Sequence, residues 1–157
     1  MSSFDRKEAM KQLPEETKTK IDNYERALRR DIIDAGLQKE EKALTDVLLD
    51  FRISYECSEY YRKKYNRQAQ KVNKMAREPY VGPSYAEAQR VANEYSKQCM
   101  ILSNYKAFYE EYDRVATQLS TRADMANKKI DKELRDRGLL DETSMGPSKK
   151  TTTPKKR

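Results

Sequence analysis

Residues 78–87 read Glu-Pro-Tyr-Val-Gly-Pro-Ser-Tyr-Ala-Glu and separate two long helical patterns. Two prolines and a glycine fall close together, a composition that ends a helix and turns the chain. Ser84 followed by Glu87 is the pattern of a capping box, so a new helix is expected to begin there. Because the connection is only about six residues long, the flanking helices are predicted to lie antiparallel and side by side.

The residues on both sides of this turn repeat at helical spacing. Before the turn, apolar, aromatic and small residues recur in steps of mostly three and four at Leu44, Leu48, Phe51, Tyr55, Ser58, Tyr61, Tyr65, Ala69, Val72 and Ala76. After it, the repeat continues at Ala92, Tyr95, Cys99, Leu102, Tyr105, Tyr109, Tyr112, Ala116, Leu119, Ala123, Ala126 and Ile130. These two seams predict helices over 38–77 and 84–137, and the second would be roughly 80 Å long.

A third, shorter helix is predicted over 14–36. Pro14 fits the first helical position, and the two acids after it suit the positive end of the helix dipole. Gly36 followed by Leu37 fits a C-terminal glycine cap with an apolar residue behind it, and Gly138 with Leu139 repeats that pattern. The alternative is one longer helix that crosses Gly36 at a cost of about 1 kcal/mol relative to alanine.

Together these elements predict an all-α fold, an elongated antiparallel helical hairpin or coiled coil with the shorter third helix packing at its base. Folding the chain about its turn places Tyr61 near Ile101 and leaves Cys57 and Cys99 about 9 Å out of register along the axis. Disulfide Cα atoms lie within about 7 Å, so an intrachain disulfide is not expected. Both cysteines are interpreted as small apolar residues of the seam or beside it.

The composition bounds this fold. Hydrophobic residues make up 36% and charged residues 38% of 157 residues, which suits helices that share a thin apolar seam. Complete disorder is the competing interpretation of so polar a chain, and the Tyr-rich repeat argues against it. We expect residues 1–13 to form a short, weakly held helix or to remain a loose segment, 14–137 to be the helical domain and 138–157 to be a disordered basic tail.

The charges are concentrated in one place. Residues 60–77 carry seven positive charges and no acid, which equals the net charge of +7 of the whole chain. On a helix these charges lie opposite the seam, and their like-charge neighbours four residues apart cost a few tenths of a kcal/mol each. A solvated helix face is the plain interpretation, and an anion-binding face is the functional one. The candidate anion-binding residues are Tyr60, Lys63, Lys64, Arg67, Lys71, Lys74 and Arg77.

The C-terminal tail holds a second basic cluster at Lys149, Lys150, Lys155, Lys156 and Arg157. Thr153-Pro154-Lys155-Lys156 matches the Ser/Thr-Pro-x-Lys/Arg pattern favoured by proline-directed kinases, which makes Thr153 a possible phosphosite. The cluster would serve as a nuclear-import signal or an electrostatic anchor. A tail that only solvates the protein is the alternative.

The sequence lacks the common catalytic motifs. It has no histidine, no Gly-rich phosphate loop and no paired-cysteine metal motif, so we expect no enzyme activity, no cofactor and no metal. The acids Glu110, Glu111 and Asp113 are expected to form surface ion pairs. No apolar run is long enough for a transmembrane helix, and an intracellular location, cytoplasmic or nuclear, is expected.

These features predict a non-enzymatic scaffold or adaptor that packs against itself or a protein partner through its helical seam and presents a basic hairpin tip. One alternative is a nucleic-acid-binding or packaging protein that uses the 60–77 face and the tail. A further alternative is a peripheral protein that binds an anionic membrane surface.

Overall fold

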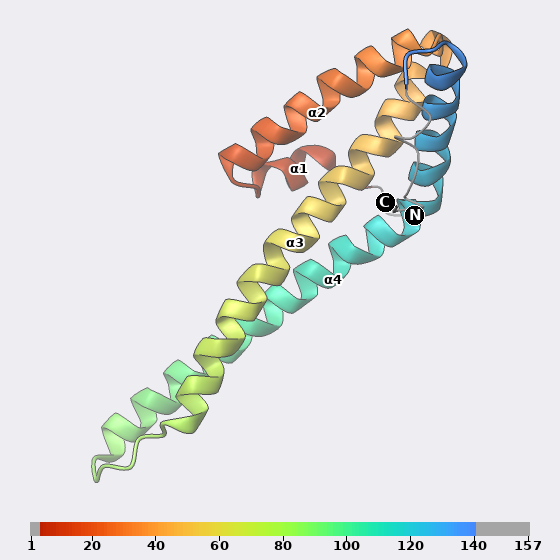
Figure 1. The fold of residues 1–157 in the computed structure, drawn as a ribbon. Helices are drawn as coiled ribbons and strands as arrows, with labels where there is room; N and C mark the ends of the chain where they lie inside the picture. Colours follow the sequence, from red (N-terminus) through yellow and green to blue (C-terminus); the bar gives the residue numbers. More distant parts are fainter. Residues whose placement is uncertain (1–3, 141–157) are drawn as a thin grey trace, which may run out of the picture. The chain divides into compact units, whose positions relative to one another are not determined.

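The computed structural model describes residues 4–140 and is all-α (Figure 1). No β-strand occurs among these residues. The two longest helices pack against each other in opposite directions, which confirms the predicted hairpin. In chain order, the elements are α1 (Arg6–Lys11), α2 (Glu15–Asp34), the 3₁₀ helix η1 (Gln38–Glu40), α3 (Glu41–Arg77) and α4 (Tyr85–Asp136).

Both predicted glycine caps end a helix. Gly36 has a φ of +77°, a left-handed conformation that costs an L side chain about 1–2 kcal/mol. The amide of Leu37 donates to the carbonyl of Ile32 at 3.0 Å, the long hydrogen bond of a Schellman motif. Gly138, with a φ of +75°, ends α4 in the same way. The chain therefore breaks after α2 and does not cross Gly36 as one longer helix.

The helix starts differ slightly from the predicted caps. Ser84 Oγ accepts a hydrogen bond from the amide of Glu87 at 3.1 Å, as a capping residue should. The Ser84 amide donates to the hydroxyl of Tyr80 at 3.3 Å, while the Glu87 carboxylate pairs with Arg90, so the return bond of the capping box is not made. Pro14 occupies the cap position of α2 and not its first helical position.

The chain forms two compact units, which the sequence did not predict. The first unit contains the N-terminal residues through Leu13 together with Ile53–Ala116, and therefore α1, most of α3 and the first part of α4. The second contains Pro14–Arg52 and the chain from Thr117 onward, and therefore α2, the start of α3 and the end of α4.

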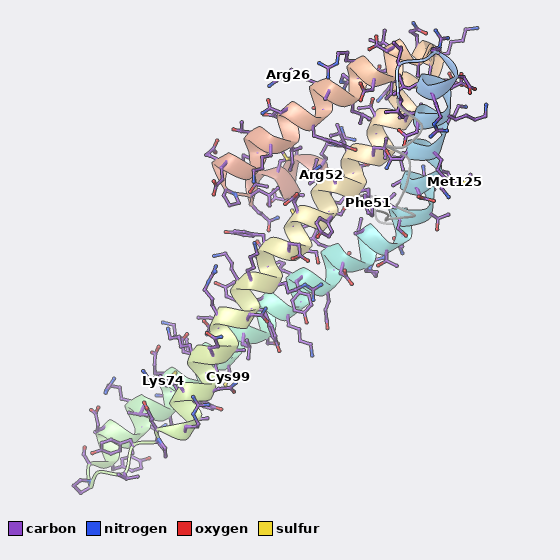
Figure 2. All side chains as sticks on the ribbon, viewed as in Figure 1. Arg26, Phe51, Arg52, Lys74, Cys99 and Met125 are labelled. Atoms are coloured by element: carbon purple, nitrogen blue, oxygen red, sulfur yellow. The ribbon has the colours of Figure 1, made fainter. Side chains whose placement is uncertain are left out.

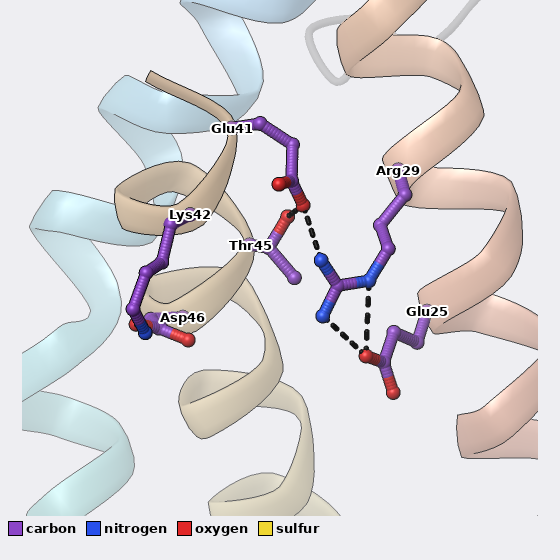
Figure 3. Close-up of polar contacts among 6 residues, drawn as sticks. All are labelled: Glu25, Arg29, Glu41, Lys42, Thr45 and Asp46. Atoms are coloured by element: carbon purple, nitrogen blue, oxygen red, sulfur yellow. Dashed lines mark hydrogen bonds and ion pairs between the residues drawn. The ribbon is translucent and has the colours of Figure 1, made fainter. Parts of the chain in front are cut away.

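The second unit is a three-helix arrangement with an aliphatic core, in which α2 is the predicted third helix. Figure 3 shows its polar edge, where the Arg29 guanidinium on α2 pairs with Glu25 at 2.6 Å and with Glu41 on α3. Thr45, which is buried, donates to the same Glu41 carboxylate at 2.9 Å. The core residues are Leu28, Ile32, Ala35, Leu37, Val47, Leu48, Ala123, Ala126, Ile130 and Leu134.

In the first unit, α1 packs onto the α3–α4 hairpin, in the N-terminal segment where a short, weakly held helix or a loose chain was expected. Asp5 caps α1 by accepting from the amide of Glu8 at 3.0 Å. Ala9 and Leu13 are buried, and the Cys57 thiol of α3 donates to the carbonyl of Ala9 at 3.4 Å. The helix is short, so these tertiary contacts and not its own propensity hold it.

The register of the hairpin differs from the predicted one by at least one helical turn. Gln68 was expected opposite residue 94, and its amide bonds the side chain of Gln98 at 2.8 Å. Tyr61 was expected near Ile101 and instead packs against Tyr105 and residues beyond it. The predicted register assumed a turn centred midway between the two helices. The connection instead runs beside the start of α4, whose first turn lies beyond the end of α3 (Figure 1).

The predicted seam is only partly buried. Ser58, Tyr61 and Val72 are buried as expected. The prediction is wrong for four members, which are exposed: Tyr55, Ala76, Ala92 and Tyr95. The N-terminal half of α3 also buries residues on a second side of the helix, which the single-seam pattern missed: Leu49, Ile53, Ser54 and Cys57.

Candidate anion-binding face and hairpin groove

Five of the seven cations in the 60–77 run form one exposed face of α3, which we call the basic face: Lys63, Arg67, Lys71, Lys74 and Arg77. Successive members are four, four, three and three residues apart, so they lie along one side of the helix over about 21 Å. None of them makes an ion pair with any residue in the described part of the chain. The face therefore carries uncompensated positive charge, which attracts anions.

The other two cations of the run, Arg62 and Lys64, contact aromatic rings. The Arg62 guanidinium lies 4.8 Å from the centre of the Tyr109 ring and 3.8 Å from the Asp113 carboxylate. The Lys64 ammonium lies 5.0 Å from the Tyr60 ring centre and 5.8 Å from that of Tyr105. Cation–π contacts of this kind favour keeping the charge at the aromatic rings.

Tyr60 is also not a free aromatic on the basic face. It is half-buried, its ring packs edge-on against Tyr61 at 5.1 Å, and Lys64 lies over it. A nucleic-acid base needs an open ring face on which to stack. The structure therefore places Tyr60 and Lys64 with the aromatic cluster, apart from the five exposed cations.

That cluster centres on Tyr61, which packs on rings from α4, the closest being Phe108 at 4.9 Å between centroids. The ring of Tyr112 is parallel to that of Tyr61 at 6.1 Å. Gln12, at the end of α1, bridges both hydroxyls: its amide donates to Tyr112 at 2.8 Å and its carbonyl accepts from Tyr61. Burial, reinforced by the neighbouring phenols, raises the pKa of Tyr61 to about 12.

A polar pair holds the hairpin together closer to the connection. Gln68 on α3 donates to the backbone carbonyl of Gln98 at 2.9 Å and to its side chain at 2.8 Å. The Gln98 amide then donates to Glu94 at 2.7 Å, and Gln98 itself is buried. A satisfied polar pair inside a thin interface favours one register over its neighbours.

Beyond this pair, α3, the connection and α4 enclose an open groove of about 610 Å³, which we call the hairpin groove. Its walls are mostly apolar or aromatic, and they include Met75, Pro79, Tyr80, Val91, Ala92 and Tyr95. Lys71 and Lys74 of the basic face also line it. Figure 2 labels Lys74 on α3 and Cys99 on α4 in this part of the hairpin. A mostly apolar hollow with a few charged groups is typical of a binding site.

Sequence reasoning missed this groove and the Gln12 bridge. One signal was present: the seam of α4 can be traced back from Ala92 through Ala88 to Tyr85 in steps of four and three. The bridge had no such signal, because Gln12 and Tyr112 are brought together only by the packing of α1.

The two cysteines are free thiols, as predicted. Cys57 is buried, and burial raises the pKa of its thiol to about 12, with the charge of Glu56 adding to the effect. A thiol with so high a pKa is almost entirely un-ionised at neutral pH, which makes it a poor nucleophile. Cys99 is partly exposed.

The remaining predicted sites can be placed briefly. Glu111 pairs with Arg114 and Asp113 with Arg62, as expected, whereas Glu110 makes no ion pair with a described residue. Within residues 4–140, no His, Cys, Asp or Glu cluster has the makeup of a metal site, and no helix has the length and apolarity to cross a membrane. The tail residues Lys149, Lys150, Lys155, Lys156 and Arg157, and the possible phosphosite Thr153, lie outside the described residues.

No protein-family model, curated protein or solved structure matches this chain.

Proposed function

We propose that this protein is a non-enzymatic helical scaffold that binds an acidic partner through the basic face of α3. The observation that carries the proposal is a one-sided row of exposed cations without acidic partners among residues 4–140. Elsewhere the described helix surfaces mix their charges, as the pairs Lys42–Asp46 and Lys128–Asp124 show. A surface that serves only solubility gains from such mixing, since like charges four residues apart repel.

An acidic protein surface is the favoured anion. The aromatic ring that would have stacked on a nucleic-acid base, Tyr60, is half-buried, with Lys64 over it and Tyr61 packed against it. The five cations of the basic face have no aromatic side chain among them. Their positive charges suit carboxylates that are spaced along another helix. Duplex DNA and an anionic membrane remain the alternatives that the experiment must separate.

The test compares two double variants of equal net charge. K63E/R67E reverses two cations of the basic face, and K97E/K106E reverses two exposed cations of α4 outside it. Binding of each full-length protein to polyglutamate, duplex DNA and phosphatidylserine vesicles is measured at low and moderate salt. We expect polyglutamate binding that K63E/R67E abolishes and K97E/K106E largely retains.

Two results would contradict the proposal. Equal losses in both variants would mean that net charge, and not the basic face, causes the binding. Steeply salt-dependent DNA binding that exceeds polyglutamate binding and is lost in K63E/R67E would favour the nucleic-acid alternative, and the same pattern with vesicles would favour the membrane.

A further inference from the structure

The first turns of α4 carry a helix-pairing seam that the hairpin itself does not cover. Tyr85, Ala88, Ala92 and Tyr95 follow each other in steps of three, four and three, the a/d spacing of a coiled coil. All four are exposed, and Tyr85 is 81% exposed. The seam spans about 15 Å before it reaches the partly buried Cys99 and Leu102.

Three of these seam residues, Ala88, Ala92 and Tyr95, line the hairpin groove, so the exposed seam and the hollow form one continuous surface. The two alanines leave room on α4 for larger side chains from outside. Met75 and Tyr80 provide apolar contact on the facing walls. The shape therefore suits a helix that inserts apolar side chains at a and d positions between α4 and the connection.

The charged residues beside the groove indicate which residues an incoming helix would carry next to its apolar positions. Lys71 and Lys74 line the groove from α3, and neither makes an ion pair with a described residue. Glu78 lies on the wall as well, and Glu87 is paired with Arg90. Acidic residues at the e and g positions of an incoming helix would meet the two lysines.

We propose that the hairpin groove binds an amphipathic helix of a partner protein, with apolar residues at a and d and acidic residues beside them. This inference rests on the proposed scaffold function and names the class of partner. A second copy of this chain is a poorer occupant, because a symmetric groove-to-groove contact would bring together two sets of Lys71 and Lys74.

The probe is a dye-labelled peptide of about three heptads with Leu at a and d and Glu at e and g, a length set by coiled-coil geometry. A twin peptide carries Lys in place of Glu. Binding to the full-length protein is followed by fluorescence anisotropy. We expect the Glu peptide to bind at least about tenfold more tightly than its Lys twin, and K71E/K74E to reverse that preference.

A second comparison tests the groove and not only its charge. Ala92 lies in the groove and Ala107 lies outside it, and both are exposed on α4, so each tolerates a longer side chain without loss of fold. A92E should weaken Glu-peptide binding by about tenfold or more, whereas A107E should leave it nearly unchanged. Helicity measured by circular dichroism confirms that both variants are folded.

The proposal fails if the two peptides bind equally well or if A92E behaves like A107E. It also fails if light scattering shows a dimer that A92E dissociates, because a second copy would then occupy the groove. Polyglutamate binding by the wild-type protein and its loss in K63E/R67E do not involve the groove. Failure here therefore leaves the basic-face proposal separately testable.

Discussion

Gln12 links α1 to both long helices of the hairpin. Its side chain satisfies the hydroxyls of Tyr61 and Tyr112 at once, and Tyr61 is buried. Gln12→Ala would leave both hydroxyls without this partner, so we expect a loss of about 1–2 kcal/mol in the free energy of unfolding. Urea denaturation followed by circular dichroism measures it. Lys7→Ala, on the exposed side of α1, is the control, and an equal loss there would contradict the bridge.

Asp131 is a carboxylate whose pKa is raised by burial, with Asp31 adding to the effect and Arg135 partly opposing it. Folding therefore disfavours the ionised carboxylate of Asp131. The resulting loss of stability is absent below the ordinary pKa of 3.8 and grows as the pH rises from there through the raised pKa of the folded protein. Asp131→Asn should increase the free energy of unfolding at pH 7 by less than about 1 kcal/mol, because solvent screens the site. The melting temperature at pH 7 should rise accordingly.

The gain from Asp131→Asn should vanish below the ordinary carboxyl pKa, where both proteins are neutral at this position. Asp124→Asn serves as the control, because Asp124 is exposed and pairs with Lys128 at 3.1 Å. Melting curves across the acid range would count against this account if the gain persisted at the lowest pH.

At the scale of the elements, the two glycine caps provide a matched pair. Gly36 and Gly138 have nearly the same positive φ, so alanine at either position costs about 1–2 kcal/mol in backbone strain. A Cβ at Gly36 would also fall 1.9 Å from Nη2 of Arg137, so the end of this exposed side chain would have to move, whereas a Cβ at Gly138 would meet no atom within 4 Å. The Gly36 cap also turns Leu37 into the core, while Leu139 is 60% exposed.

We therefore expect Gly36→Ala to lower the melting temperature more than Gly138→Ala does. Thermal unfolding followed by circular dichroism gives the comparison directly. Equal losses would mean that only backbone strain matters and that neither Arg137 nor the burial of Leu37 contributes.

At the scale of the whole molecule, the chain builds two compact units that share its two long helices, α3 and α4, while α1 belongs to the first unit and α2 to the second. Sequence order hides this, because α1 belongs with the middle of the chain while α2, its neighbour in sequence, does not. The N-terminal residues should therefore protect a site far along the chain, and Cys57 is the reporter because its thiol donates to Ala9.

Deleting residues 1–13 should expose Cys57 to a thiol reagent. In the full-length protein we expect Cys99 to react and Cys57 to stay protected, since Cys57 is buried and its pKa is raised to about 12. The deleted protein should show two reactive thiols, and a Cys99→Ser background isolates the second one. Rapid reaction of Cys57 in the folded full-length protein would contradict the packing of α1.

The local signals of this chain were sufficient for its three longer helices. Positive-φ glycines, the Pro79–Pro83 turn and the spacing of three and four act within a few residues, so the all-α hairpin and both caps could be predicted without tertiary contacts. The row of cations was visible for the same reason, since α-helical spacing alone places Lys63, Arg67 and Lys71 on one side.

Contacts between distant residues decided the rest. The hairpin register depends on the path of the connection beside α4 and on the pairing of Gln68 with Gln98, neither of which has a local signature. The packing of α1 buries Cys57, the Tyr105 ring of α4 attracts Lys64, and Tyr60 packs against Tyr61, the centre of the aromatic cluster. Helical propensity acts over a few residues, whereas burial depends on which surfaces meet, and only the folded chain determines that.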